Sequence, residues 1–230
     1  MPTPSVPETR TGSFIPVSYT HLDHKRAYDQ DKGPNTGGMG TFSPSRIYSA
    51  QLAGQCMAEI FLPTIRAMAA EGRPFKGVLY FGLMITKDGP KVIEYNARFG
   101  DPETQVVLPR LKTDLVDILN AVMDEKLDEI QLTWDEGAAA CVVMASGGYP
   151  GKYQTGLAIS GLEQAAALPD TMIYHAGTKL DQGVYYTAGG RVLGVTRLGH
   201  NLDDAIRKTY EAVEKIHFDH AHYRTDIGIK

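Results

Sequence analysis

The stretch Lys91-Val-Ile-Glu-Tyr-Asn-Ala-Arg-Phe-Gly-Asp101 decides how this chain is interpreted, because it begins as a strand and spaces three polar side chains two residues apart. Successive side chains of an extended chain point to opposite faces. We therefore expect Glu94, Asn96 and Arg98 on one face of the strand and the apolar residues between them on the other.

A carboxylate, a carboxamide and a guanidinium in one row outline a surface for Mg²⁺ and phosphate. Mg²⁺ prefers oxygen ligands, usually takes one or two protein groups, and completes its shell with water and substrate phosphates. Glu94 and Asn96 are candidate metal ligands, and Arg98 is a candidate for neutralising the remaining phosphate charge. The alternative is a half-solvated antiparallel strand, which alternates polar and apolar residues in the same way.

The composition of the chain is that of an ordinary globular protein, with 230 residues, 43% of them hydrophobic and 22% charged. A formal net charge of −4 argues against a nucleic-acid-binding surface. No apolar run approaches the length of a membrane span, and the N-terminus lacks the pattern of a secretory signal. Cys56 and Cys141 lie far apart in apolar segments, so we expect buried thiols and a cytoplasmic protein.

The first two segments of the chain show no regular spacing of apolar residues. Residues 1–22 are rich in Pro, Ser and Thr and are expected to be extended or disordered. A charged, glycine-rich loop follows at 23–40. The apolar run 78–86 predicts a strand buried on both faces, and the turn 87–90 returns the chain into the strand that carries Glu94.

Two helices are predicted around this hairpin. The segment 47–71 has Ser43 and Ser45 as candidate caps and Gly72 as its end. Pro63 falls inside this helix and should kink or divide it. The segment 111–127 repeats apolar residues at helical spacing and predicts the second helix.

Near Trp134 the composition changes to short strands with glycine-rich turns, and a last helix is expected at 202–216. The fold class predicted from this order is α+β. We expect three parts: a leader at 1–22, a sheet-and-helix region at 23–130, and a small β-rich C-terminal subdomain at 131–230.

The segment Gly33-Pro-Asn-Thr-Gly-Gly-Met-Gly40 holds four glycines in eight residues. Glycine lets backbone N–H groups approach a ligand closely. Asn35 and Thr36 add hydrogen-bonding side chains, and Lys25 with Arg26 adds positive charge upstream. Either this loop closes over an anionic substrate or it is a surface turn; its spacing fits neither a phosphate P-loop nor a dinucleotide fingerprint.

Two further acidic residues, Asp101 and Glu103, follow directly after the strand that carries Glu94. Chain leaving a strand end is where substrates commonly meet a scaffold. Asp101 is alternatively a cap for a helix that begins at Pro102.

A histidine-rich stretch at 217–222 invites a zinc interpretation, but its spacing lacks the paired ligands of structural zinc sites. His175 is better explained as a hydrogen-bonded structural residue. Lys179 and Arg191 are interpreted as solvated surface charges.

Six motifs occur in order along the chain: DHKR at 23–26, GPNTGGMG at 33–40, EYNARFGDPETQ at 94–105, GGYPG at 147–151, HAGT at 175–178 and YRTDIG at 223–228. Together they closely resemble the phosphoribosylamine–glycine ligase family, ATP-grasp enzymes of de novo purine synthesis. The resemblance runs from about Asp23 to Ile229. It implies that the first part of the chain is a partial ATP-grasp module.

The resemblance also implies a reaction in which ATP, glycine and 5-phosphoribosylamine give glycinamide ribonucleotide, ADP and phosphate through a glycyl phosphate. Glu94 and Asn96 match the family's Mg²⁺- or Mn²⁺-binding pair, and Arg98 matches a catalytic arginine that stabilises charge on the transferring group. The positions expected on the substrate side are Lys25, Asn35, Thr36, Gly37, Gly38, Asp101 and Glu103.

Members of this family carry about two hundred further residues ahead of the DHKR motif, including the nucleotide flap. The chain is therefore expected to need this N-terminal half as its partner and to be inactive alone. Two other interpretations stay open. One is a non-catalytic fragment that assembles with a separate N-terminal chain, and the other is a different ATP-grasp carboxylate–amine ligase.

Overall fold

The computed structural model describes residues 22–229, so nearly all of the leader expected at 1–22 lies outside the described residues. The described chain divides into two compact units that alternate along the sequence. We call residues 22–47, 99–112 and 134–229 the sheet unit, and residues 48–98 and 113–133 the hairpin unit. The sheet unit thus joins two segments of the part expected at 23–130 to the part expected at 131–230, and that expected division stays a prediction.

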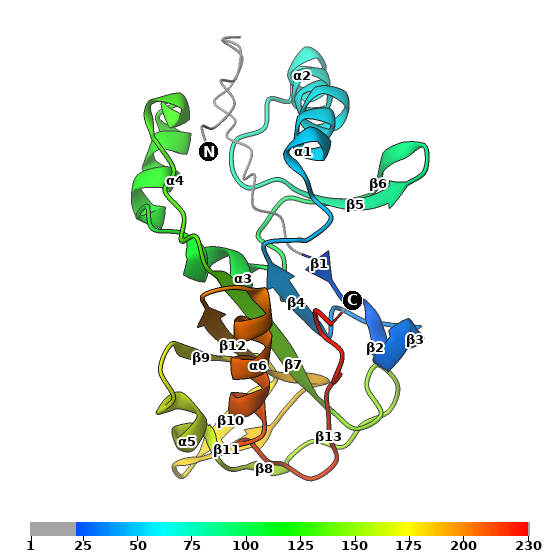
Figure 1. Cartoon of the computed structure of the whole chain (residues 1–230), viewed down its shortest axis with the longest axis vertical. Helices are drawn as coiled ribbons and strands as arrows, with labels where there is room; N and C mark the ends of the chain where they lie inside the picture. Colours follow the sequence, from blue (N-terminus) through cyan, green and yellow to red (C-terminus); the bar gives the residue numbers. More distant parts are fainter. Residues whose placement is uncertain (1–21, 230) are drawn as a thin grey trace. The chain divides into compact units, whose positions relative to one another are not determined.

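The sheet unit is built on an antiparallel sheet in the order β1-β4-β7-β12-β9, with β13 also paired to β7. Figure 1 shows helix α6 lying against β7 and β12. The elements of this sheet and its helix are β1 (Leu22–Asp23), β4 (Gly40–Ser43), β7 (Ala138–Ser146), β9 (Thr171–His175), β12 (Arg191–Gly199), β13 (Ala221–His222) and α6 (Leu202–Val213).

Strand β7 is buried along its whole length and separates two apolar clusters. Val142 and Met144 pack in the main core with residues of β12 and α6. Ala139 and Cys141, which point to the other face, pack against Val106. Because both faces are covered, small residues fill most of the strand and every side chain is withdrawn from water.

Shorter elements surround this sheet. A second sheet has the order β10-β11-β8, and β2 pairs with β3 in a ribbon of two strands. The bounds are β2 (Arg26–Tyr28), η1 (Asp29–Asp31), β3 (Lys32–Asn35), α3 (Thr104–Val107), η3 (Leu108–Arg110), β8 (Ala158–Ile159), α5 (Leu162–Ala166), β10 (Thr178–Asp181) and β11 (Val184–Thr187).

The hairpin unit contains helices around one β-hairpin. Its elements are α1 (Ala50–Cys56), the π-helical η2 (Met57–Phe61), α2 (Leu62–Ala70), β5 (Tyr80–Thr86), β6 (Gly89–Asn96), α4 (Leu115–Met123) and η4 (Leu127–Glu129). The turn between β5 and β6 lies at residues 87–88, within the turn predicted at 87–90.

The helix predicted over 47–71 is present at 50–70, but its N-cap is Ser49 rather than Ser43 or Ser45. Its end at Gly72 is confirmed, because Gly72 adopts a φ of 74° that suits glycine. Pro63 does divide the hydrogen-bonding pattern. Proline has no N–H to donate, and the π-helical turn η2 ends two residues before it.

The expectation that the strand 78–86 is buried on both faces is wrong for the described chain. Met84 is 53% exposed and Ile85 40% exposed, and on β6 Ile93 is 62% and Tyr95 51% exposed. Among the described residues, β5 and β6 form a sheet of their own, so each strand has a partner on one edge only. The apolar face predicted behind Glu94 is therefore largely exposed.

The two other predicted helices are present but shorter than predicted. The helix expected over 111–127 is shorter, because Asp114 caps it and α4 starts at Leu115. The last helix ends at Val213 instead of residue 216. No helix in the described range 22–229 has the length and apolar character needed to cross a bilayer.

The core of the sheet unit predicts a strong difference between two leucines. Leu193 on β12 is fully buried, so Leu193→Ala should lower the free energy of unfolding by about 2–5 kcal/mol through lost burial and a cavity. Leu180 on β10 is 55% exposed, and Leu180→Ala should change it by less than about 0.5 kcal/mol. Urea unfolding followed by circular dichroism measures both, and equal effects would contradict this core assignment.

Candidate functional site

The glycine-rich loop of the sheet unit is fixed to the chain just before it. The backbone N–H and hydroxyl of Thr36 both donate to the carbonyl of Lys25, at 2.7 and 2.8 Å. The N–H of Gly38 in turn donates to the Thr36 hydroxyl at 3.0 Å. Thr36 therefore sets how the loop folds back over Lys25.

Glycine is required at position 38. Its φ is 119°, and a Cβ atom there would lie 2.5 Å from Pro102 and 2.8 Å from Oδ1 of Asp23. Both the backbone conformation and the space exclude a side chain. The loop can consequently approach the segment that begins at Asp101.

Arg191, at the start of β12, joins these two segments. Its Nη1 donates to the carbonyl oxygens of Gly37 and Asp101, each at 3.0 Å, and its Nη2 lies 3.3 Å from the Asp101 carboxylate. The side chain is only 22% exposed. The interpretation of Arg191 as a solvated surface charge is therefore wrong. Tyr149 adds a second tether, because its hydroxyl accepts the N–H of Gly37 at 3.1 Å.

Two buried carboxylates lie beside this junction. The side chains of Asp23 and Glu103 are 6% and 4% exposed, and Nζ of Lys25 lies 2.6 Å from Asp23 and 3.8 Å from Glu103. The Lys25 side chain is itself 44% exposed, although its ammonium pairs with these buried carboxylates. A cation placed in this way can bind an anionic group.

Burial raises the pKa of Asp23 to about 6, and the nearby charge of Glu103 acts in the same direction. Lys25 and Arg191 act to lower this pKa but do not restore its ordinary value. Asp23 thus changes its charge close to neutral pH.

The candidate metal ligands lie in the hairpin unit, which is described by itself. Glu94 and Asn96 are two residues apart on β6 and pair with Gly82 and Tyr80 of β5. A Cβ atom on Gly82 would lie 2.8 Å from Cγ of Glu94, so the Glu94 side chain folds over this glycine. One carboxylate and one carboxamide on one strand are hard oxygen donors that fit Mg²⁺ or Mn²⁺.

Arg98 does not continue this row, because β6 ends at Asn96 and Arg98 lies in the bend that follows. The expectation that all three side chains share one face of a strand is wrong at its third member. The role of Arg98 stays a prediction.

The predicted cap at Asp101 is also absent. Helix α3 begins at Thr104, and Glu103 precedes it without a side-chain cap bond. Asp101 instead accepts a hydrogen bond from the amide of Gln105 at 3.0 Å and pairs with Arg191. The Asp101 carboxylate therefore helps to bind Arg191, which joins this segment to the glycine-rich loop.

Of the predicted substrate-side residues, Lys25, Thr36, Gly37, Gly38, Asp101 and Glu103 come together in the sheet unit. Asn35 is exposed and pairs with Arg26 in the β2–β3 ribbon. Asp23, Tyr149 and Arg191 were missed. Asp23 and Tyr149 belong to the recognised motifs DHKR and GGYPG, and this membership could have identified them. Arg191 lies outside the six motifs, and only the glycine pair before it sets it apart.

Two of the histidines considered from sequence have structural partners. Nε2 of His222 lies 2.8 Å from the carbonyl oxygen of Ala27, and Nδ1 of His175 lies 3.0 Å from the Thr178 hydroxyl. Within residues 22–229, no group of three or more His, Cys, Asp or Glu side chains could hold a metal ion.

Two family models match the chain. The phosphoribosylglycinamide synthetase ATP-grasp (A) domain matches residues 10–104, and the C domain of the same synthetase matches residues 139–230. The first match begins inside the segment that the sequence assigned to a leader outside the family.

Curated relatives are identical to this chain at about half of the aligned positions. A phosphoribosylamine–glycine ligase of Halalkalibacterium halodurans is 53% identical over 208 residues, covering 90% of this chain and 48% of the relative. The Escherichia coli ligase of the same description is 51% identical over 221 residues, covering 94% of this chain and 51% of the relative. The chain thus spans about half the length of the curated relatives it matches.

Solved structures agree with these matches. A phosphoribosylamine–glycine ligase of Thermotoga maritima superposes with a TM-score of 0.75 at 35% identity, covering 90% of this chain and 51% of that protein. A biotin carboxylase of Campylobacter jejuni, at 14% identity and a TM-score of 0.55, covers 80% of this chain and 40% of its own and resembles it in fold alone.

The buried cluster predicts an unusual titration at Asp23. Carboxyl-carbon NMR should give a midpoint near pH 6, and Glu103→Gln should lower it, because a neighbouring negative charge is removed. The same change at the exposed Glu163 of α5 should leave the midpoint unchanged. A midpoint near the ordinary value of 3.8 in the unaltered chain would contradict the description of this cluster.

The same shift predicts the direction of a pH effect on stability. The pKa of folded Asp23 lies above its ordinary value, so the stabilisation by the protonated form is complete below pH 3.8 and is lost as the pH rises through about 6. The full loss is about 3 kcal/mol. Asp23→Asn should remove this part of the pH dependence in urea unfolding.

Proposed function

Because this chain belongs to the phosphoribosylglycinamide synthetase family of ATP-grasp ligases, we propose that it supplies the C-terminal half of an enzyme that joins glycine to 5-phosphoribosylamine. ATP phosphorylates the glycine carboxylate, and the amine of phosphoribosylamine then displaces phosphate from the glycyl phosphate. The products are glycinamide ribonucleotide, ADP and phosphate. The similarity to phosphoribosylamine–glycine ligases over about nine-tenths of the chain carries this proposal.

The ATP side of the reaction belongs to the hairpin unit. Glu94 and Asn96 would hold Mg²⁺ or Mn²⁺. Gly82, which has no side chain, leaves room for the Glu94 side chain to fold over it. When bound, the metal ion neutralises phosphate charge. Arg98 stabilises charge on the transferring group, a contribution typically worth ~10²–10³ in rate.

The acceptor side belongs to the sheet unit. Lys25 has a side chain that is 44% exposed and ends in an ammonium, which suits the carboxylate of glycine or the phosphate of phosphoribosylamine. The glycine-rich loop is fixed to the backbone of Lys25 through Thr36 and is held in place by Tyr149 and Arg191. The buried carboxylates of Asp23 and Glu103 fix the ammonium in place.

We propose that the chain works with the N-terminal part that its relatives carry, and that the reaction takes place in the cytoplasm. Phosphoryl transfer depends almost entirely on positioning and charge stabilisation. Since this chain covers about half of each relative, one half of the nucleotide clamp alone should not turn over.

This proposal predicts activity only on reconstitution. The chain alone should give no detectable glycine-dependent ADP, whereas mixing it with the separately expressed N-terminal half of the Halalkalibacterium relative should restore synthesis of glycinamide ribonucleotide. Arg98→Met should reduce the restored rate by ~10²–10³. Mass spectrometry of the product and coupled measurement of ADP give both results.

Two outcomes would contradict the proposal. Synthesis by the chain alone would show that the N-terminal half is not needed. A stable complex of the two halves without glycine-dependent turnover would favour a non-catalytic fragment. Replacing glycine with other amino acids distinguishes a different carboxylate–amine ligase, which would prefer another acid.

A further inference from the structure

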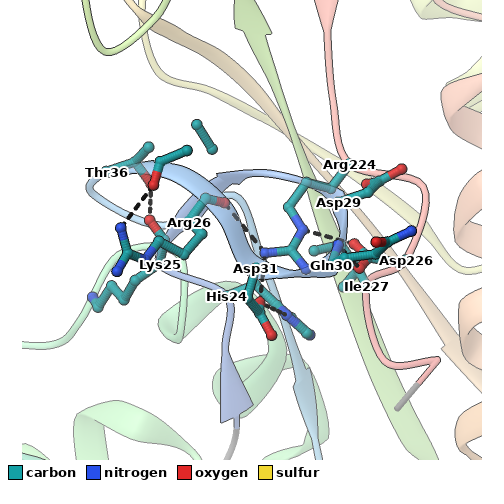
Figure 2. A network of polar contacts seen from close by, with 12 residues as sticks. His24, Lys25, Arg26, Asp29, Gln30, Asp31, Thr36, Arg224, Asp226 and Ile227 are labelled. Atoms are coloured by element: carbon teal, nitrogen blue, oxygen red, sulfur yellow. Dashed lines mark hydrogen bonds and ion pairs between the residues drawn. The ribbon is translucent and has the colours of Figure 1, made fainter.

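The C-terminal segment 223–228 is bound along its length to a bent segment, residues 24–31, nearly two hundred residues earlier in the chain. Figure 2 shows these contacts from close by. The N–H and hydroxyl of Thr225 both donate to the Asp29 carboxylate, at 2.8 and 2.5 Å. The N–H of Gln30 donates to the Asp226 carboxylate at 2.7 Å. Contacts therefore run in both directions between the two segments.

Arg224 is the centre of this network, with a side chain that is fully buried. Its Nε and Nη2 donate to the two carboxylate oxygens of Asp226 at 2.7 and 2.9 Å. Its Nη1 donates to the Asp31 carboxylate at 2.9 Å and to the carbonyl of Arg26 at 3.2 Å. One guanidinium thus binds its own segment with one edge and the bent segment with the other.

The bent segment needs such support because its backbone is strained. Gln30 and Asp31 have φ values of 60° and 55°, in the left-handed region that non-glycine residues avoid. Two consecutive residues in that region persist only where surrounding contacts hold them. The contacts from Gln30 to Asp226 and from Asp31 to Arg224 fall on these two residues.

A continuous set of contacts leads from Arg224 to the glycine-rich loop. Arg224 binds the carbonyl of Arg26, and the Arg26 side chain donates to the carbonyl of Gly33 at 2.7 Å. The next residue back, Lys25, accepts both hydrogen bonds of Thr36, as described above. The bent segment therefore carries both the substrate-side ammonium and the point at which the loop is fixed.

His24 closes the other end of the bent segment. Its Nε2 accepts the N–H of Gly228 at 3.2 Å, which requires a neutral ring, and its Nδ1 lies 3.7 Å from Asp31. Burial, and then the positive charge of Arg224, lower the pKa of His24 and keep Nε2 available as an acceptor.

We propose that Arg224 is a positioning residue: it holds the bent segment so that Lys25 and the glycine-rich loop are placed to receive the anionic substrate. The statement about substrate rests on the proposed function, whereas the statement about the loop does not. Arg224 touches neither the loop glycines nor the Lys25 ammonium in any contact described above, so it acts through the backbone of residues 24–31.

Lysine should not replace Arg224. A guanidinium presents its donors in a planar fork that serves two carboxylates and a carbonyl at once, whereas an ammonium is a single point. Arg224→Lys keeps the buried charge, so it separates the loss of this geometry from the larger penalty of leaving Asp226 and Asp31 without a cation.

Amide hydrogen exchange on the unaltered chain and its variants tests the proposal without any activity. In Arg224→Lys, the amides of Thr36 and Gly38 should exchange about tenfold faster, because hydrogen bonds to charged groups are lost beneath the loop. The amides of β7 and β12 should keep their protection. Arg207→Lys is the matched control, since Arg207 also pairs with two carboxylates but is 59% exposed on α6. It should change none of these rates.

Unchanged exchange at Thr36 and Gly38 in a folded Arg224→Lys variant would overturn the proposal. If that variant loses protection in β7 as well, Asp31→Asn decides instead, because Asp31 is 51% exposed and asparagine tolerates its backbone conformation. Replacing the charged acceptor with a neutral one should accelerate loop exchange about fivefold. No acceleration in Asp31→Asn would overturn the proposal.

Kinetics of the reconstituted enzyme test the substrate statement. Arg224→Lys should raise KM for phosphoribosylamine or glycine about tenfold and leave KM for ATP unchanged, because the candidate ATP-side residues lie in the other unit. A fall in kcat alone, with every KM unchanged, would indicate lost folded enzyme and contradict positioning. Absence of synthesis by the unaltered halves would refute the proposed function, while the exchange result would still decide the role of Arg224.

Discussion

The pairing of β7 with β4 and β12 is the constraint on which the sheet unit depends. Both partners are antiparallel to β7, with Gly40 opposite Val142 and Arg191 opposite Ala145. The start of β12 therefore lies opposite the end of β7, and the chain that leads into β4 runs toward the same end of the sheet. The glycine-rich loop, Arg191 and the turn that carries Tyr149 meet there, although they are far apart in sequence. A shift of this register by one residue would exchange the side chains of β7 that pack in the main core with those that pack against Val106.

Three cationic side chains connect the segments that meet at this end of the sheet unit. Lys25 is held by two buried carboxylates, Arg191 joins the loop to Asp101, and Arg224 ties residues 24–31 to the C-terminal segment. A buried ion pair adds little net stability unless its geometry and hydrogen bonds are good. For Arg224, burial acts to lower the pKa, but the bonds to Asp226 and Asp31 outweigh it and keep the side chain charged. These cations set how Lys25, the glycine-rich loop and residues 24–31 are placed relative to one another.

Much of the local structure followed from sequence because it depends on neighbouring residues. The long helix, its end at Gly72, the β5–β6 hairpin and the helix at the C-terminus are set by period, turns and caps. The motifs also named residues that the structure brings together around Lys25 and Gly38, and their role toward substrate stays a prediction. What motifs did not give was the partnership of Arg191, since its contacts are with residues 90 and 154 positions away. The exposure of β5 and β6 was missed for a related reason: apolar composition predicts burial, while the strands that could provide it are not among the described residues.

The central claim is that Lys25 and the loop at 36–38 form the acceptor side of a ligase that this chain completes with an N-terminal partner. Backbone NMR of the two-part complex, titrated with glycinamide ribonucleotide, examines this most directly. We expect the largest shifts at the amides of Thr36, Gly37 and Gly38, while amides of the β10–β11 hairpin stay in place. Saturable binding of the product that leaves the loop amides unmoved would place the acceptor site elsewhere and contradict the account.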